Sequence, residues 1–115
     1  NIIIASGGSA ANSAVGFSLL GGRSAVIGRV KSDNFGSLYI NDLKEANVDF
    51  ISNSVDTGNE TGRCLVYVSP DAQRSMRTYL GAASNLSPEN LDINAFENSE
   101  IVYMEGYLWD EPVAK

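Results

Sequence analysis

The sequence has no histidine and a single cysteine, Cys64, and these two shortages limit its chemistry. A catalytic cysteine usually takes a histidine as its base, so the usual Cys–His pair cannot form within this chain. One cysteine also cannot form an intrachain disulfide, which fits the reducing environment of the cytoplasm. We therefore expect a cytoplasmic protein in which Cys64 is an ordinary residue of an apolar strand.

Long hydrophobic runs and basic residues are scarce as well. No stretch approaches the roughly 18 apolar residues of a transmembrane helix, and no basic segment followed by an apolar one marks a signal peptide. The 8 basic and 14 acidic side chains give a net charge of −6, spread along the chain. This balance disfavours nucleic acids and anionic membranes, so we expect neither as a partner.

Two common phosphate-binding motifs are missing: the G-x-G-x-x-G of dinucleotide-binding folds and the G-K-[ST] of P-loops. The composition is that of an ordinary globular protein, with 43% hydrophobic and 19% charged residues among 115. This length suffices for one domain. Because the chain starts at Asn1 without a methionine, we expect that sequence upstream of it has been lost.

Residues 7–12, Gly-Gly-Ser-Ala-Ala-Asn, are the stretch most suggestive of a binding site. Adjacent glycines let a ligand approach the backbone, and a helix beginning behind them would present unpaired N–H groups and a positive dipole end. A buried Asn12 one turn into that helix could donate to and accept from a polyhydroxylated ligand. The alternative is a plain strand-to-helix turn, with Ser9 as the N-cap and Asn12 as its local partner.

The pattern of apolar residues predicts alternating strands and helices. We expect helices over residues 10–20 and 34–46, the second capped by Asp33 and ending at a left-handed Asn47. Its apolar stripe has one polar exception, Asp42. The expected strands are residues 2–5, 24–30 and 101–108, an edge segment at 48–55, and an antiparallel hairpin of 63–69 with 75–80. Residues 87–90 should open a further short helix. This alternation is typical of an α/β fold with parallel strands.

Several short motifs, in order along the chain, resemble the PfkB (ribokinase-like) family of carbohydrate and nucleoside kinases. They are the glycine pair and Asn of residues 7–12 with a later Gly21, D-x-x-G at 33–36, T-G-x-C at 61–64, G-A at 81–82 and M-E-G-Y at 104–107. Residues 62–83 and 103–109 are most similar to bacterial adenosine kinase-like and sugar kinase-like members. The closing glycine of the first signature is replaced by Lys31.

The resemblance implies a ribokinase-like three-layer α/β/α core with a small β-lid, of which only the amino-terminal part is present. Residues 1–115 would then be a single partial domain. It implies transfer of the ATP γ-phosphoryl group to a sugar or nucleoside hydroxyl. Gly7, Gly8, Asn12 and Glu105 would then bind the sugar. Residues 1–6 and 48–62 would supply lid pieces. ATP and Mg²⁺ would bind outside this segment, and a homo-oligomer is expected.

The family's second signature, D-T-x-G-A-G-D, is absent, so we expect no catalytic residue and no metal ligand here and an inactive isolated segment. Asn94 and Glu97 match the family's N-x-x-E literally, but in the wrong place. Asp33 is interpreted as a helix cap rather than a ligand contact. Two other hypotheses stay open: a non-enzymatic sugar- or nucleoside-binding module, and a purely structural α/β piece.

Overall fold

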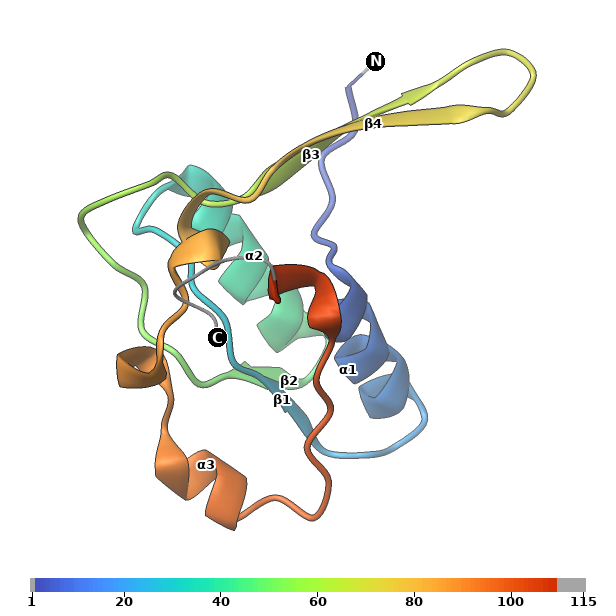
Figure 1. Ribbon diagram of the computed structural model, residues 1–115. Coiled ribbons are helices and arrows are strands. Elements are labelled where there is room, and N and C mark those ends of the chain that lie inside the picture. Colours follow the sequence, from blue (N-terminus) through green and yellow to red (C-terminus); the bar gives the residue numbers. More distant parts are fainter. Residues whose placement is uncertain (1, 110–115) are drawn as a thin grey trace.

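In the computed structural model, which describes residues 2–109, helices and a small parallel sheet form a body from which a β-hairpin projects (Figure 1). Three 3₁₀ turns lie at Gly81–Asn85, Pro88–Asn90 and Gly106–Leu108. The regular elements are α1 (Ser9–Leu19), β1 (Ser24–Val26), α2 (Asn34–Glu45), β2 (Val48–Phe50), β3 (Arg63–Val68), β4 (Arg74–Tyr79) and α3 (Ile93–Glu97).

Strands β1 and β2 pair in parallel, with Ser24 opposite Val48 and Val26 opposite Phe50. Because parallel neighbours cannot be joined by a tight turn, α2 forms the crossover between them. The pairing is interrupted after these strands and resumes at a bridge between Lys31 and Val55. The α/β class with parallel strands, expected from the alternation of elements, is confirmed.

The core lies where α1 and α2 pack on the sheet. Its buried members are Ala11 of α1, Val26 of β1, Leu43 of α2 and Val48 of β2. Val48 has only 1% of its surface exposed. At the edge of this cluster, the rings of Tyr39 and Phe50 meet edge to face with centroids 6.0 Å apart. The small residues Ala11 and Ala14 of α1 let that helix sit close to the sheet.

Both ends of α2 follow the expected capping rules. The Asp33 carboxylate accepts a hydrogen bond of 2.8 Å from the Gly36 amide, which is one of the unpaired donors of the first turn. At the other end Asn47 adopts φ 56°, the left-handed conformation that stops a helix. The chain therefore changes direction after α2 and enters β2 directly.

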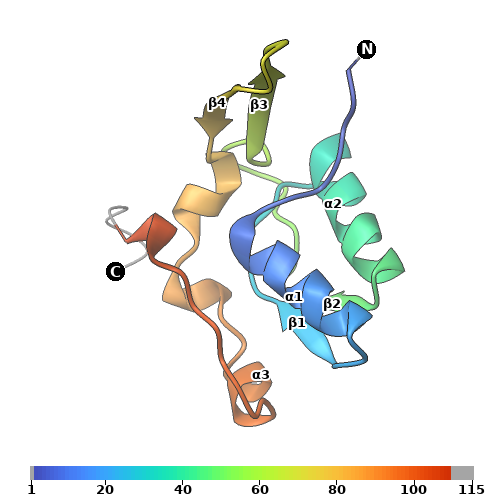
Figure 2. The ribbon, with the colours of Figure 1, turned by 90° about the vertical axis from the view of Figure 1, so that its right-hand side faces the viewer.

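The hairpin of β3 and β4 is antiparallel, with Arg63 opposite Tyr79 and Val68 opposite Arg74. Every residue of both strands is exposed. The two views agree that the hairpin extends away from the body, on the side where the chain begins (Figures 1 and 2). A two-stranded ribbon has no core of its own, so its position depends on how its base is attached.

One predicted lid piece lies elsewhere. Val48–Phe50, expected as part of a lid over residues 48–62, is strand β2 of the core sheet. The family resemblance implied a lid position for this segment, but Val48 packs under α2 because the chain enters it straight from the helix end. Among the described residues, the projecting element is the β3–β4 hairpin instead.

Two predicted strands are absent from the described residues, and a third is shorter. Residues 2–5 and 101–105 are in no regular element, and residues 106–108 form a 3₁₀ turn. Ile101 and Met104 are more than four-fifths exposed. The strand expected over 24–30 ends at Val26.

No described helix has the length and apolar character needed to cross a membrane.

Candidate functional site

An open cleft of about 370 Å³ lies between the segment that precedes α1 and the two helices α1 and α2. Gly7 and Asn12 line it from the start of α1, and Asp42 lines it from α2. Apolar side chains of Val15, Leu43 and neighbouring residues complete its walls. A mixed lining with a few polar groups is the usual character of a small-molecule site.

The glycine pair forms the turn into α1. Gly8 is the N-cap and has φ 110°, a conformation that other residues rarely adopt. The alternative with Ser9 as the N-cap is wrong, because Ser9 is the first residue of the helix and no side chain caps it. A Cβ atom at Gly7 would have no heavy atom within 4 Å. Packing therefore does not explain the glycine at position 7, which lines the cleft.

Asn12 is exposed, contrary to the buried position that we expected. Its backbone amide donates to the Gly8 carbonyl oxygen at 2.8 Å, the first hydrogen bond of α1. Within residues 2–109 its side chain makes no hydrogen bond, so it is not the local cap partner of the alternative reading. Among the described residues this amide group has no partner, and Asn12 lines the cleft.

Glu105 lies at the amino end of α1, although 96 residues separate it from Ser9. The Ser9 hydroxyl donates to Glu105 Oε1 at 2.7 Å, and the Tyr103 hydroxyl donates to the same oxygen at 2.8 Å. The hydrogen bond to Glu105 and the negative charge of that carboxylate raise the pKa of Tyr103. A carboxylate is favourable here because the helix dipole is positive at this end.

The structure thus brings the four predicted residues, Gly7, Gly8, Asn12 and Glu105, to the first turns of one helix. Asp42 was missed as a site residue. It is half-buried, accepts a hydrogen bond of 2.5 Å from the Ser6 hydroxyl, and forms part of the α2 wall of the cleft. The signal was present in the sequence, since Asp42 interrupts the apolar stripe of its helix.

A second cavity of about 380 Å³ lies between residues 28–29, 51–55 and 89–92, and none of the predicted site residues lines it. The Arg29 guanidinium at its wall donates to the Asn85 carbonyl oxygen at 3.0 Å and to Asn90 Oδ1 at 2.9 Å. Residues 87–90, expected to open a short helix, form the 3₁₀ turn Pro88–Asn90, which Ser87 and Asn90 close as a capping box. Arg29 therefore ties the segment after the hairpin to the stretch of chain that follows β1.

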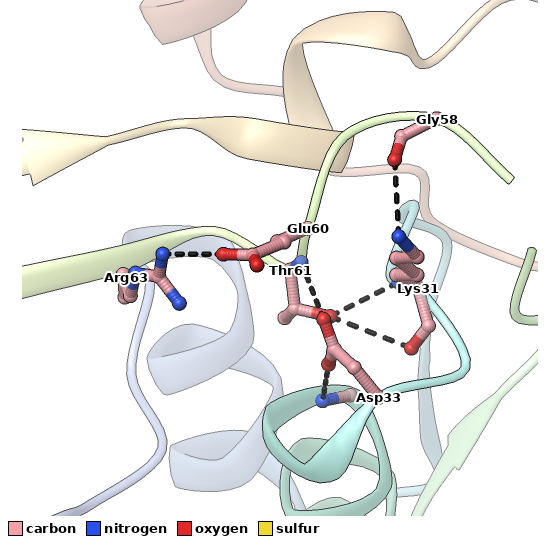
Figure 3. A network of polar contacts seen from close by, with 7 residues as sticks. Lys31, Asp33, Gly58, Glu60, Thr61 and Arg63 are labelled. Atoms are coloured by element: carbon pink, nitrogen blue, oxygen red, sulfur yellow. Dashed lines mark hydrogen bonds and ion pairs between the residues drawn. The ribbon is translucent and has the colours of Figure 1, made fainter.

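A polar network joins α2 to the base of the hairpin (Figure 3). Asp33 Oδ1 accepts from the Thr61 hydroxyl at 2.7 Å, and Oδ2 accepts from the Thr61 amide at 2.9 Å. Burial raises the pKa of Asp33, but the hydrogen bonds from Thr61 and Gly36 and the charge of Lys31 outweigh it, so its pKa is lowered. The interpretation of Asp33 as a helix cap agrees with this geometry. The same carboxylate also binds Thr61 at the base of the hairpin.

This lowered pKa predicts a loss of stability in acid. A carboxylate with a depressed folded-state pKa stabilises the fold above its ordinary value of 3.8, and the stabilisation is lost as the pH falls through the folded pKa. We expect the free energy of unfolding to decrease below about pH 4, measured by urea unfolding at several pH values. Asp33→Asn should flatten this decrease.

The exposed Asp71 supplies the control for this measurement. Its pKa is also lowered, by hydrogen bonds from the Ser69 hydroxyl and the Gln73 amide, so it contributes to the same pH range. Asp71→Asn should leave the contribution of Asp33 to the acid dependence in place. Identical pH profiles for the wild type and Asp33→Asn would contradict the assignment to Asp33.

Residues 4–114 match the family described as pfkB family carbohydrate kinase, and the chain belongs to this family. The chain is similar to the crystal structure of adenosine kinase from Sinorhizobium meliloti, with 42% identity and a TM-score of 0.87 over 94% of this chain. A probable sugar kinase from Rhizobium etli CFN 42 is 38% identical over 92% of this chain, with a TM-score of 0.85. Among curated proteins, a probable chloroplastic fructokinase-6 of Arabidopsis thaliana is 34% identical over 86%.

These matches cover only part of the relatives. The chain spans 33% of the adenosine kinase, 32% of the sugar kinase and 26% of the fructokinase. The ribokinase-like α/β class and the likeness to adenosine kinase-like and sugar kinase-like proteins, both expected from the motifs, are confirmed.

ATP is documented for one relative. The uncharacterized sugar kinase PH1459 from Pyrococcus horikoshii, solved in complex with ATP, is 33% identical over 81% of this chain, with a TM-score of 0.74. Within residues 2–109 no group of three or more His, Cys, Asp or Glu residues is arranged to hold a metal ion.

Proposed function

We propose that this chain forms the acceptor-binding part of a kinase that transfers the γ-phosphoryl group of ATP to a hydroxyl of a sugar or nucleoside. In the proposed enzyme, ATP and Mg²⁺ bind to residues beyond this segment, which alone would not catalyse transfer. A cytoplasmic location is part of this proposal, because a chain with a single cysteine cannot form an intrachain disulfide. Family membership supports the reaction class, and the named relatives support sugars and nucleosides as acceptors.

One observation supports an acceptor-binding site here: residues far apart in the sequence lie together at the first turns of α1. Gly7 and Asn12 face the cleft, and Glu105 is held beside Ser9. This set offers an amide, a carboxylate and open backbone within one helix start. Hydroxyl groups both donate and accept, so a sugar ring matches such a set. Phosphoryl transfer depends mainly on positioning and electrostatics, and these residues would position the acceptor.

Asn12→Ala tests this proposal in the full-length protein. We expect acceptor binding to weaken by about 1–3 kcal/mol, because the sugar hydroxyls lose a partner that is desolvated in the complex. ATP binding should barely change. Calorimetry with ribose, fructose and adenosine, and separately with ATP, measures both.

Asn41→Ala is the matched control, since Asn41 is an exposed asparagine of α2 that does not line the cleft. It should leave acceptor binding unchanged. An equal loss for acceptor and ATP in Asn12→Ala would show a structural effect instead. Acceptor binding without any transfer to it in the full-length protein would favour the alternative, a non-enzymatic binding module.

We further propose that the protein forms a homo-oligomer through the hairpin. Directly paired strand residues share a face, so Leu65 and Tyr67 lie on one face and Val66, Val68 and Met76 on the other. All five are at least half exposed. Exposed apolar ribbons of this kind are normally covered by a partner.

Sedimentation at micromolar concentration tests the oligomer. We expect the wild type to sediment as a dimer or larger assembly, and Leu65→Glu or Val66→Glu, one on each face, to shift it to the monomer. Ile93→Glu changes an equally exposed apolar residue of α3 and should have no effect. A wild type that is monomeric at every concentration would refute the proposal.

A further inference from the structure

Tyr103 precedes Glu105 by two positions in an extended part of the chain. Glu105 has φ −118° and ψ 148°, and side chains two residues apart in extended backbone lie on the same side. Residues 101–105 belong to no regular element, so among the described residues no strand pairing fixes this segment. The position of the Glu105 side chain therefore depends on the hydrogen bonds that its carboxylate accepts.

Both hydroxyl groups that bind this carboxylate use the same oxygen. The Ser9 hydroxyl and the Tyr103 hydroxyl donate to Glu105 Oε1 at 2.7 Å and 2.8 Å. Within residues 2–109, Oε2 accepts no hydrogen bond. An ionised carboxylate can accept through both oxygens. The two donors thus hold the group by Oε1, and Oε2 keeps its capacity to accept from a ligand hydroxyl.

The Tyr103 hydroxyl also lies close to the first turns of α1. Ser13 is one turn beyond Ser9, on the same face of the helix. Its hydroxyl donates to the Ser9 carbonyl oxygen at 3.1 Å. Ser13 is near enough to the Tyr103 hydroxyl to lower the pKa of that phenol by a small amount. The phenol of Tyr103 is therefore placed between Glu105 and this serine face of α1.

The charge of Glu105 favours the donor form of Tyr103. The hydrogen bond to Glu105, and next its negative charge, raise the pKa of Tyr103 above its ordinary value of 10.0. Tyr107 adds only a minor effect in the same direction. A neutral phenol donates to a carboxylate, whereas a phenolate would repel it. Hydrogen bonds to an ionised acceptor are also stronger than those between neutral groups.

We propose that Tyr103 is a positioning residue, which holds Glu105 by Oε1 at the start of α1 so that Oε2 binds a hydroxyl of the acceptor. Ser9 supplies the second donor from the helix itself. The consequence for acceptor binding rests on the proposed function, whereas the contact between Tyr103 and Glu105 does not. The two parts can therefore be tested separately.

The contact can be tested without any reaction. Replacing Tyr103 by 3-fluorotyrosine in the full-length protein gives a fluorine resonance that reports the ionisation of this phenol alone. The fluorine lowers the phenol pKa, so the titration is complete at a milder pH. We expect Glu105→Gln to move the titration midpoint to lower pH, because it removes the negative charge that keeps the proton on the phenol.

A carboxylate elsewhere in the chain supplies the control for this titration. Glu97→Gln changes an exposed side chain of α3 and should leave the midpoint unchanged. An unchanged midpoint in Glu105→Gln would show that Tyr103 does not bind this carboxylate, and it would overturn the proposal.

Steady-state kinetics of the full-length enzyme test the positioning role. Tyr103→Phe should raise the KM for the acceptor about three- to tenfold, the range for losing one hydrogen bond. The KM for ATP should stay the same, and kcat should change far less. Tyr107→Phe removes a phenolic hydroxyl at the same distance along the chain from Glu105, and it should be silent. An equal effect of the two substitutions would contradict a specific role of Tyr103.

A double substitution separates positioning from general damage. If Tyr103 acts through Glu105, adding Tyr103→Phe to Glu105→Gln should cost much less than Tyr103→Phe costs in the wild type. Additive effects, or equal losses for acceptor and ATP, would mean a merely structural tyrosine and would overturn the positioning claim. If the full-length wild type transfers no phosphoryl group, the proposed function fails, and the fluorine titration still decides whether Tyr103 holds Glu105.

Discussion

Gly36→Ala is expected to destabilise the protein by about 3 kcal/mol or more, at the upper end of what overpacking costs. The new methyl group would lie 2.0 Å from the Lys31 carbonyl oxygen and 3.0 Å from the Thr61 hydroxyl. Backbone cannot give way as a flexible side chain can, so either α2 shifts or the Asp33–Thr61 contact breaks. Urea unfolding of the full-length protein, followed by circular dichroism, measures the change.

The same substitution at Gly16 is the matched control. Gly16 lies inside α1, and a Cβ atom there would have no heavy atom within 4 Å. Alanine is the better helix former, so Gly16→Ala should stabilise by up to about 1 kcal/mol. Opposite signs at the two positions are the expected result. A loss at Gly16 as large as that at Gly36 would show that the fold is intolerant of alanine in general.

Glu105→Gln is expected to reduce kcat/KM for the acceptor by about 10- to 100-fold in the full-length enzyme, the range for losing a hydrogen bond to a charged group. The amide keeps the size of the side chain but removes its charge and one acceptor. Ser9 holds Glu105 at the amino end of α1, so the side chain should remain in place. Steady-state kinetics with varied acceptor at saturating ATP measures the effect.

Two further variants make this result specific. Glu97→Gln changes an exposed carboxylate of α3, which only by coincidence completes an N-x-x-E pattern, and it should be silent. Tyr103→Phe keeps the Glu105 charge and removes one of its two hydrogen-bond donors, so its effect should be smaller than that of Glu105→Gln. Full activity of Glu105→Gln would remove Glu105 from the proposed site.

The elements that could be predicted from the sequence are those set by local rules. The capping by Asp33, the left-handed Asn47 and the hairpin turn depend on residues within a few positions of one another. The strand expected over 101–108 failed for a different reason, since a strand needs a partner and nothing in those residues specifies one. Val48–Phe50 was misplaced because its burial comes from the helix packed on it, which the residues of the segment do not reveal.

The candidate site was predictable in its residue types but not in its geometry. The glycine pair pointed to the start of α1, whereas the exposure of Asn12 could not be read from its neighbours. Asp42 stood out in its apolar stripe, yet its hydrogen bond crosses 36 positions to Ser6. The hydrogen bonds between Asp33 and Thr61 could not be predicted for the same reason, because the two residues are 28 positions apart.

The hairpin also carries the only thiol of the chain, and this has a practical consequence. Cys64 is exposed, and the Thr78 hydroxyl on the neighbouring strand donates to its sulfur at 3.4 Å. A maleimide dye would therefore attach at one known point of this chain, without removing other cysteines from it. Its emission would report the surroundings of β3 as candidate sugars are added, so ligands can be screened before the reaction is known.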